Sequence, residues 1–146
     1  MPPDVENIKG KARRIWEEIF PQGDVDGLAE VIHPDSFDHT DPSGPQGFEA
    51  VKNTMLWLNG VFSDQVWDIH HVIGEGDTVA VHCTLTAVHT GDLMGIPPTG
   101  RQIRQPYVQI LRFEDGKAIE RWGVRDDATL MRQLGVMPPP KKPADV

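Results

Sequence analysis

The sequence is poor in basic residues, in cysteine and in long hydrophobic runs, and each shortage excludes a class of protein. Fourteen Lys and Arg stand against 22 Asp and Glu over 146 residues, which gives a net charge of −8. Nucleic-acid and anionic-membrane binders need clustered cations, so neither partner is expected. Cys83, the only cysteine, cannot form an intramolecular disulfide or a thiolate metal cluster. No apolar run approaches the roughly 20 residues that cross a bilayer.

Motifs with a known chemistry are also scarce. The sequence lacks a Gly-rich phosphate loop, a nucleophile elbow and a dinucleotide fingerprint. Its six histidines show no recognisable metal-ligand spacing, and His70 and His71 should point to opposite faces of one strand. We therefore expect neither a metal ion nor a cofactor. The N-terminus has neither the basic start nor the apolar stretch of a signal peptide, which favours a cytoplasmic protein.

The composition fits one globular domain with room for an internal pocket. We predict this domain over residues 1–136, followed by a Pro-rich tail over residues 137–146. Apolar residues recur at spacings of three and four along residues 5–19 and 48–62, which predicts two amphipathic helices. Asp24 can cap a shorter helix between them.

The second half of the chain changes to alternating, β-rich segments. Strands are expected at residues 36–40, 66–73, 78–90, 103–113 and 118–125, and a short final helix around Leu130 and Leu134. Helices that precede a run of long antiparallel strands describe an α+β domain. A strongly curved, mostly antiparallel sheet with the N-terminal helices across its open side leaves a cone-shaped internal pocket.

Five short segments carry a family resemblance, in one order along about residues 33–135. They are His33–His39, Gly74–Val81, His89–Arg101, Asp115–Trp122 with Asp126 beyond it, and Leu130–Gly135. Together they resemble the SnoaL-like polyketide cyclases, a branch of the nuclear transport factor 2-like superfamily. Ala87-Val88-His89 departs from the family's usual Gly-Thr-His, and the larger residue at the glycine position would narrow or reshape the site.

The resemblance implies a six-stranded curved sheet, a helix-covered pocket and a homodimer formed through the outer sheet face. It also implies a reaction without a cofactor. In that reaction an aspartate removes and returns a proton while a polyketide ester closes a ring by intramolecular aldol condensation. The aspartate that matches the family is Asp126, four residues after Trp122.

Asp126 has two interpretations. Trp122, Val124 and Asp126 share one face of a strand, so an inward Trp122 would aim Asp126 into the pocket. Burial there would raise the carboxyl pKa and match the group to proton abstraction at neutral pH. Alternatively, Asp126 or Asp127 only caps the final helix.

Two histidines are the other catalytic candidates. His39 could polarise the substrate carbonyl or shuttle its proton, or it could only hydrogen-bond its own turn-rich loop. In the family pattern a histidine equivalent to His89 lies near the pocket. The alternative for His89 is a strand-end histidine satisfied by backbone carbonyls.

Five residues are candidates for substrate binding: Trp16, Phe37, Tyr107, Gln109 and Trp122. Trp16 lies beside the apolar stripe of the first helix, which in this superfamily crosses the cavity mouth. Tyr107 and Gln109 share a strand face and could offer an OH and an amide to an enolate oxygen. They could equally face solvent or a partner subunit.

These residues favour a cofactor-independent cyclase or isomerase, of the ester cyclase type, that acts on a small apolar carbonyl or ester compound. Two other enzymes of the superfamily remain alternatives: a ketosteroid-isomerase-like proton shuttle and a limonene-type epoxide hydrolase, which needs an Asp–Arg–Asp arrangement around a water. The alternative from another class is a non-catalytic pocket protein. It predicts a cavity lined wholly by apolar groups, with Asp126 pointing outward.

Overall fold

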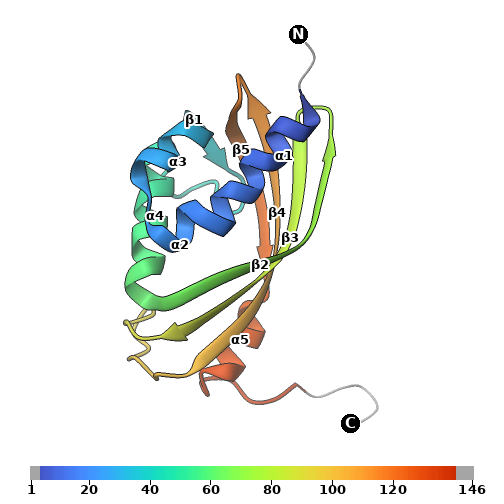
Figure 1. Ribbon diagram of the computed structural model, residues 1–146. Coiled ribbons are helices and arrows are strands. Elements are labelled where there is room, and N and C mark those ends of the chain that lie inside the picture. The colour runs from blue at the N-terminus through green and yellow to red at the C-terminus, as the bar shows by residue number, and fades with distance from the viewer. Residues whose placement is uncertain (1–3, 141–146) are drawn as a thin grey trace.

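The computed structural model describes residues 4–140, in which helices cover one face of a curved sheet (Figure 1). The sheet has five strands in the order β1-β5-β4-β3-β2. They are β1 (Ile32–Asp38), β2 (Phe62–Glu75), β3 (Thr78–His89), β4 (Gln102–Glu114) and β5 (Lys117–Arg125). All neighbours are antiparallel except β1, which runs parallel to β5. The α+β class predicted from the sequence is confirmed.

The helices of the N-terminal half lie across the concave side of the sheet (Figure 1). They are α1 (Val5–Arg14), the π-helical turn η1 (Ile15–Ile19), α2 (Phe20–Gln22), α3 (Val25–Val31) and α4 (Phe48–Val61). Asp24 caps α3 as expected, because its carboxylate accepts from the Gly27 N–H at 3.0 Å. Gly23 ends α2 with a left-handed φ of 61°, a conformation that glycine adopts without strain.

The pairing of β4 with β5 decides which residues of β5 face the helices. Tyr107 pairs with Arg125, and Leu111 pairs with Arg121. Directly opposed residues of an antiparallel pair lie on the same face of the sheet. Tyr107 and Leu111 are buried under the helices, so Arg121 and Arg125 face inward as well. The alternate residues of β5 face outward: Trp122 and Val124.

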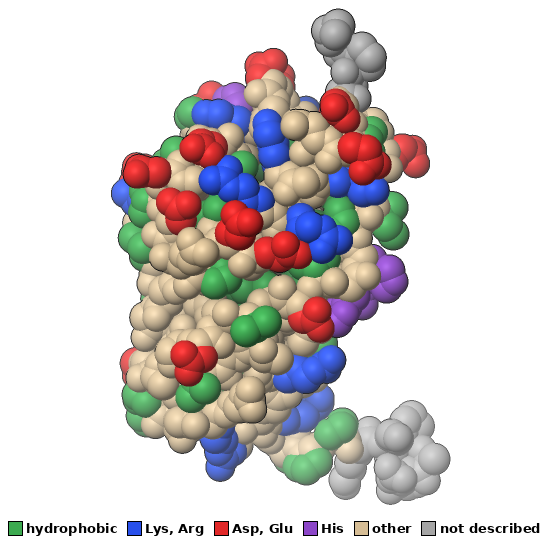
Figure 2. All heavy atoms as spheres, in the orientation of Figure 1, with side chains coloured by type: hydrophobic (Ala, Val, Ile, Leu, Met, Phe, Trp, Pro, Cys, Tyr) green, Lys and Arg blue, Asp and Glu red, His purple; other side chains and the backbone are tan. Residues whose placement is uncertain are grey.

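A β-bulge in β2 brings three histidines together on the outer face. Ile69 pairs with Cys83 and His71 with His82, so His70 is an extra residue in β2. The Nδ1 atoms of His71 and His82 are 3.0 Å apart, and the ring centroids of His70 and His82 are 5.0 Å apart. The expectation that His70 and His71 point to opposite faces is therefore wrong, because the bulge interrupts the alternation. Figure 2 shows a group of histidines at one edge of the surface.

Four further features concern the expectations for the whole chain. Residues 4–140 contain five strands where the resemblance implies six. Residues 90–101 cross from β3 to β4 and contain a single bridge, between Leu93 and Ile96. Of the predicted tail, residues 141–146 lie outside the described residues. No helix in the described part of the chain has the length and apolar character needed to cross a membrane. Likewise, residues 4–140 contain no group of three or more His, Cys, Asp or Glu side chains arranged to hold a metal ion.

Candidate active site

A cavity of about 800 Å³ lies between the concave sheet face and the helices. Large apolar side chains make most of its wall, among them Trp16, Phe20, Leu58, Phe62, Trp67 and Leu130. Trp16 is the centre of an aromatic cluster, with ring centroids 4.6 Å from Phe20 and 5.0 Å from Trp67. A wall of this kind suits flat, apolar ring systems.

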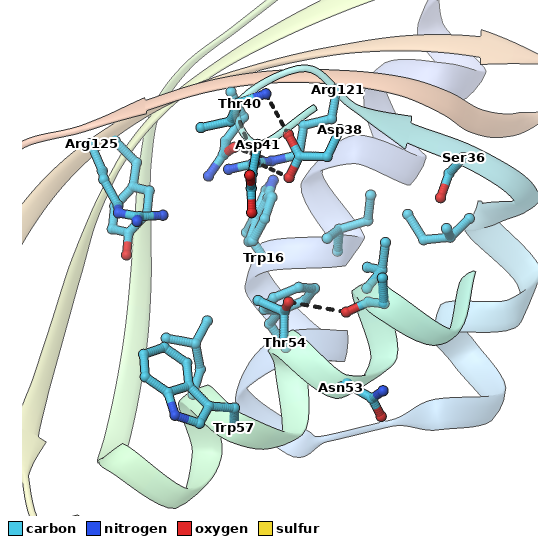
Figure 3. A pocket seen from close by; sticks show the side chains of 18 of the residues that line it. Trp16, Ser36, Asp38, Thr40, Asp41, Asn53, Thr54, Trp57, Arg121 and Arg125 are labelled. Atoms are coloured by element: carbon cyan, nitrogen blue, oxygen red, sulfur yellow. Dashed lines mark hydrogen bonds and ion pairs between the residues drawn. The ribbon is translucent and has the colours of Figure 1, made fainter. Parts of the chain in front are cut away.

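The first polar group of the cavity joins β1, β4 and β5. Arg121 donates from Nη1 to Asp38 Oδ2 at 2.9 Å (Figure 3), and from Nε to Gln109 Oε1 at 2.8 Å. The other oxygen of Asp38 accepts from the Thr40 N–H at 2.9 Å. Both Asp38 oxygens are therefore occupied. The amide nitrogen of Gln109 makes no hydrogen bond to any described residue.

A second polar group lies where β5 meets α5 (Asp127–Gln133). Asp127 Oδ1 accepts from Arg125 Nε at 2.9 Å and from Gln105 Nε2 at 3.1 Å. Gln105 Oε1 in turn accepts from the Tyr107 hydroxyl at 3.2 Å. Asp127 Oδ2 accepts no hydrogen bond within residues 4–140. These contacts fix one oxygen of the carboxylate and leave the other available to a ligand.

Tyr107 and Gln109 both line this cavity, which decides the face that the sequence left open. The Tyr107 side chain is 7% exposed. Burial raises the pKa of Tyr107 to about 12, so the phenol keeps its proton at neutral pH. Trp16 and Phe37 line the cavity too, as expected.

Asp126 caps α5 and does not line the cavity. Its Oδ1 accepts from the Thr129 N–H at 2.9 Å and its Oδ2 from the Thr129 hydroxyl at 2.6 Å. Hydrogen bonds from the hydroxyl and then the N–H of Thr129 lower the pKa of Asp126 below its usual value. The expected inward carboxylate with a raised pKa is therefore not found. Trp122 and Asp126 do lie on one side of β5, but that side is the outer one, and the capping interpretation is confirmed.

His39 and Trp122 lie together outside the cavity. Their rings stack with centroids 4.5 Å apart and an interplanar angle of 2°. His39 Nε2 lies 2.9 Å from Glu120 Oε2, and hydrogen bonds from His39 and then Arg112 lower the pKa of Glu120. The expectation that Trp122 faces the pocket is wrong, because the register with β4 turns it outward.

His89 is fully buried at the end of β3 and does not line the cavity. Its Nδ1 accepts from the Thr99 N–H at 3.2 Å and lies 3.0 Å from the Thr99 hydroxyl. His89 thus ties the end of β3 to the crossing segment, through a threonine and not through the backbone carbonyls expected.

Five polar residues of the cavity were not predicted as site residues: Asp38, Gln105, Arg121, Arg125 and Asp127. Asp127 was considered only as a possible helix cap. Arg121 and Arg125 alternate along β5 as inward residues must, but their face follows only from the pairing with β4. The sequence offered one signal for them: Arg121 and Arg125 lie an even number of positions apart, so they must share one face of a strand.

The curved sheet, the covering helices and a largely apolar cavity with acids and arginines on one wall define an enzyme of the nuclear transport factor 2-like class. The chain belongs to the SnoaL-like polyketide cyclase family, which matches residues 10–134. The nogalonic acid methyl ester cyclase of Streptomyces nogalater is 30% identical over 122 residues, which cover 80% of this chain and 89% of that protein. The aklanonic acid methyl ester cyclase DnrD of Streptomyces peucetius is 30% identical over 126 residues, covering 81% and 84%.

Solved structures share the same fold. TsrD from Streptomyces laurentii superposes with a TM-score of 0.86 at 23% identity, over 92% of this chain and 99% of its own. IdmH from Streptomyces antibioticus gives a TM-score of 0.77 at 28% identity, over 88% and 99%. These matches span nearly the whole chain, and the cone-shaped architecture expected from the sequence is confirmed.

Proposed function

We propose that this protein closes a ring in a polyketide ester by intramolecular aldol addition, without a cofactor. Relatives named for the cyclisation of nogalonic and aklanonic acid methyl esters support this substrate class. The observation that carries the proposal is the Asp127 carboxylate, which stands on the polar wall with one oxygen anchored and the other free. A non-catalytic pocket protein would instead have a wholly apolar cavity.

Asp127 acts as the general base and then as the general acid. Its Oδ2 removes a proton from a carbon next to a carbonyl, and the electron pair of that C–H bond forms the enolate. The enolate carbon attacks a second carbonyl of the same molecule, and the resulting alkoxide takes the proton back from Asp127. One C–H bond and the π bond of one C=O group are replaced by a C–C bond and an O–H bond, and the C–O single bond remains, so the product has the mass of the substrate.

Tyr107 and Gln109 stabilise the negative oxygen of the enolate. The Tyr107 hydroxyl turns from Gln105 to that oxygen, and it remains a donor because burial raises its pKa to about 12. The unpaired amide nitrogen of Gln109 supplies a second donor, and Arg121 fixes the other end of that amide at 2.8 Å. Donors that are oriented before the reaction stabilise developing charge more than mobile water does.

The contacts support Asp127 over Asp126 as the base. Both oxygens of Asp126 are bonded to Thr129, and the lowered pKa makes this carboxylate a weaker base. His39 and His89 take no part in the proposed steps, because neither side chain lines the cavity.

We also propose that the chain forms a homodimer through an outer patch on the convex sheet face. The outer patch consists of Ile73, Val108, Ile110, Trp122 and Val124, all exposed in the single chain. Val108 lies opposite Val124 and Ile110 opposite Trp122, so the patch is continuous across β4 and β5. Contiguous apolar surface of this kind is typical of a protein–protein contact, and a second copy would bury it.

The test is to incubate the purified protein with aklanonic acid methyl ester in heavy-oxygen water and to follow the product by liquid chromatography and mass spectrometry. We expect a ring-closed product of unchanged mass with no label from the solvent. Incorporation of the heavy oxygen would instead indicate epoxide hydrolysis to a diol. No closure of this ester or of nogalonic acid methyl ester above the buffer rate would contradict the proposed function.

A further inference from the structure

Two residues of the cavity wall hold buried polar atoms that no protein group satisfies. Within residues 4–140, the buried side-chain polar atoms without a hydrogen-bond partner are Trp16 Nε1, Ser36 Oγ and His89 Nε2. Trp16 and Ser36 both line the cavity. Buried polar atoms are almost always paired in folded proteins, so an unpaired one in a cavity wall indicates a ligand that supplies the partner.

The indole of Trp16 is packed into the cavity wall. Trp16 lies in the π-helical turn η1, a local widening of the helix that occurs frequently at functional sites. The indole is 5% exposed and is held between the rings of Phe20 and Trp67. Figure 3 shows Trp16 below the Asp38–Arg121 pair.

Trp67 is the natural comparison, because it belongs to the same aromatic cluster and also lines the cavity. The Trp67 side chain is as deeply buried, at 4% exposure. However, its Nε1 donates to Gln65 Oε1 at 3.1 Å. The cluster can therefore satisfy an indole N–H internally, and does so for one of its two tryptophans.

We propose that the Trp16 N–H donates a hydrogen bond to one oxygen of the bound polyketide, and that the Ser36 hydroxyl binds a second oxygen. This inference rests on the proposed function, which supplies the polyketide as the ligand. An indole N–H can only donate, so its partner is an acceptor such as a carbonyl or an ester oxygen. Ser36 comes from β1 and lies apart from Trp16 in Figure 3, so the two oxygens belong to separate positions of the ligand. Trp16 and Ser36 are positioning residues that select an oxygenated ring system over a hydrocarbon of the same shape.

Two probes of nearly identical shape test the Trp16 contact. In 2-isopropenylnaphthalene a CH₂ group replaces the carbonyl oxygen of 2-acetylnaphthalene. By calorimetry, the wild-type protein should bind the ketone about fivefold more tightly than the alkene. This ratio is the usual contribution of one hydrogen bond to an affinity. Trp16→Phe should abolish this preference. Trp67→Phe should weaken both probes alike and keep it.

The melting temperatures of the same variants show that each remains folded. Any fall in the melting temperature of Trp16→Phe should come only from the smaller buried side chain. No hydrogen bond is lost, because the donor that it removes was already unpaired. Trp67→Phe should melt lower than Trp16→Phe, since it leaves Gln65 Oε1 without its donor. The Trp16 assignment is overturned if the wild-type protein binds neither probe or does not prefer the ketone. It is also overturned if the Trp16→Phe variant keeps the preference.

Ser36 is tested with the diketone 2,6-diacetylnaphthalene against the monoketone. The second carbonyl should add about fivefold in affinity in the wild type and nothing in Ser36→Ala. Ser63→Ala is the control, because the Ser63 hydroxyl is exposed and lies 2.9 Å from the Thr90 hydroxyl. If the diketone gains as much affinity over the monoketone in Ser36→Ala as in the wild type, the proposal that Ser36 binds a second oxygen is wrong.

These binding results do not depend on turnover. A protein that prefers the ketone through Trp16 but fails to cyclise aklanonic acid methyl ester would contradict the proposed function alone. A protein that cyclises the ester but shows no Trp16-dependent preference would contradict this inference alone.

Discussion

The two faces of β5 carry different chemistry, although both come from one strand of nine residues. On the inner face, Arg121 and Arg125 each hold a carboxylate at 2.9 Å inside or at the edge of the cavity. On the outer face, Trp122 and Val124 are 38% and 73% exposed. An alternation of period two thus separates the proposed catalytic surface from the proposed dimer surface.

The two aspartates after β5 extend this division. Asp126 gives both oxygens to Thr129 and ends the strand as a helix cap. Asp127 gives one oxygen to Arg125 and Gln105 and keeps the other free at the cavity. Adjacent residues of identical chemistry therefore differ in role only through what each oxygen contacts.

The largest expected effect tests this difference between the two acids. Asp127→Asn should lower kcat for aklanonic acid methyl ester by at least about 100-fold, because positioned general bases contribute about 10²–10⁴-fold. The amide keeps an oxygen for Arg125 and Gln105, so the fold and the cavity should be unchanged. Initial rates of product formation by liquid chromatography measure the effect.

Asp126→Asn is the matched control, since asparagine also caps helices well. It should retain nearly the full rate. If Asp126→Asn is the inactive variant and Asp127→Asn the active one, the catalytic role returns to Asp126 and the contrast between the two acids is lost.

The next effect concerns the outer face. Val124→Arg should convert the proposed homodimer to a single chain, because an unpaired charge buried in an apolar contact is strongly unfavourable. Size-exclusion chromatography with light scattering gives the mass. Leu56→Arg is the control, since Leu56 is an exposed apolar residue of α4 away from the sheet. A Val124→Arg protein with the mass of the wild-type assembly would remove the outer patch as the interface.

The sequence predicted the parts of the fold that depend on local signals. The spacing of apolar residues located α1 and α4, and Asp24 was identified as a cap. Alternation located the strands, but it could not locate the bulge at His70, which exists only in the pairing of β2 with β3. The sixth strand implied by the resemblance is absent from residues 4–140, because the resemblance describes the family and not this chain.

The candidate site was predicted only in part, for the same reason. Tyr107 and Gln109 were placed on one face of β4, yet only the packing of the helices shows that this face is the inner one. The sequence was interpreted with Trp122 on the inner face of β5. Because side chains alternate between the two faces of a strand, one wrong assignment reverses the face of every other residue on it. The pairing of Arg121 with Asp38 joins positions 83 residues apart, so no local spacing reveals it.

A smaller effect tests whether Tyr107, on the inner face of β4, is buried or in contact with solvent. Tyr107 is the only tyrosine of the chain, so the ultraviolet band of the phenolate reports this residue alone. The folded protein should titrate with a pKa of about 12, because burial disfavours the phenolate, and the urea-unfolded chain near the ordinary value of 10.0. A folded-state transition at the unfolded value would place Tyr107 in contact with bulk water.

The sign of the accompanying stability change follows from the raised pKa. The folded state holds the phenol proton more tightly, so the stabilisation is complete below the unfolded pKa and is lost as the pH rises towards about 12. Tyr107→Phe should remove this alkaline loss. Urea unfolding at neutral and at alkaline pH measures it, and an identical loss in the variant would exclude Tyr107 as its source.

The smallest effect tests the outer acid itself. Asp126→Ala should lower the urea midpoint modestly and Asp126→Asn less, because only alanine leaves the Thr129 N–H without a cap. Since the folded pKa of Asp126 is lowered from 3.8, its contribution is present above that value and is lost as the pH falls through the folded pKa. The difference between the wild type and Asp126→Ala should therefore shrink in acid. If Asp126→Ala is as stable as the wild type at neutral pH but no longer cyclises the ester, Asp126 serves the reaction and not the helix.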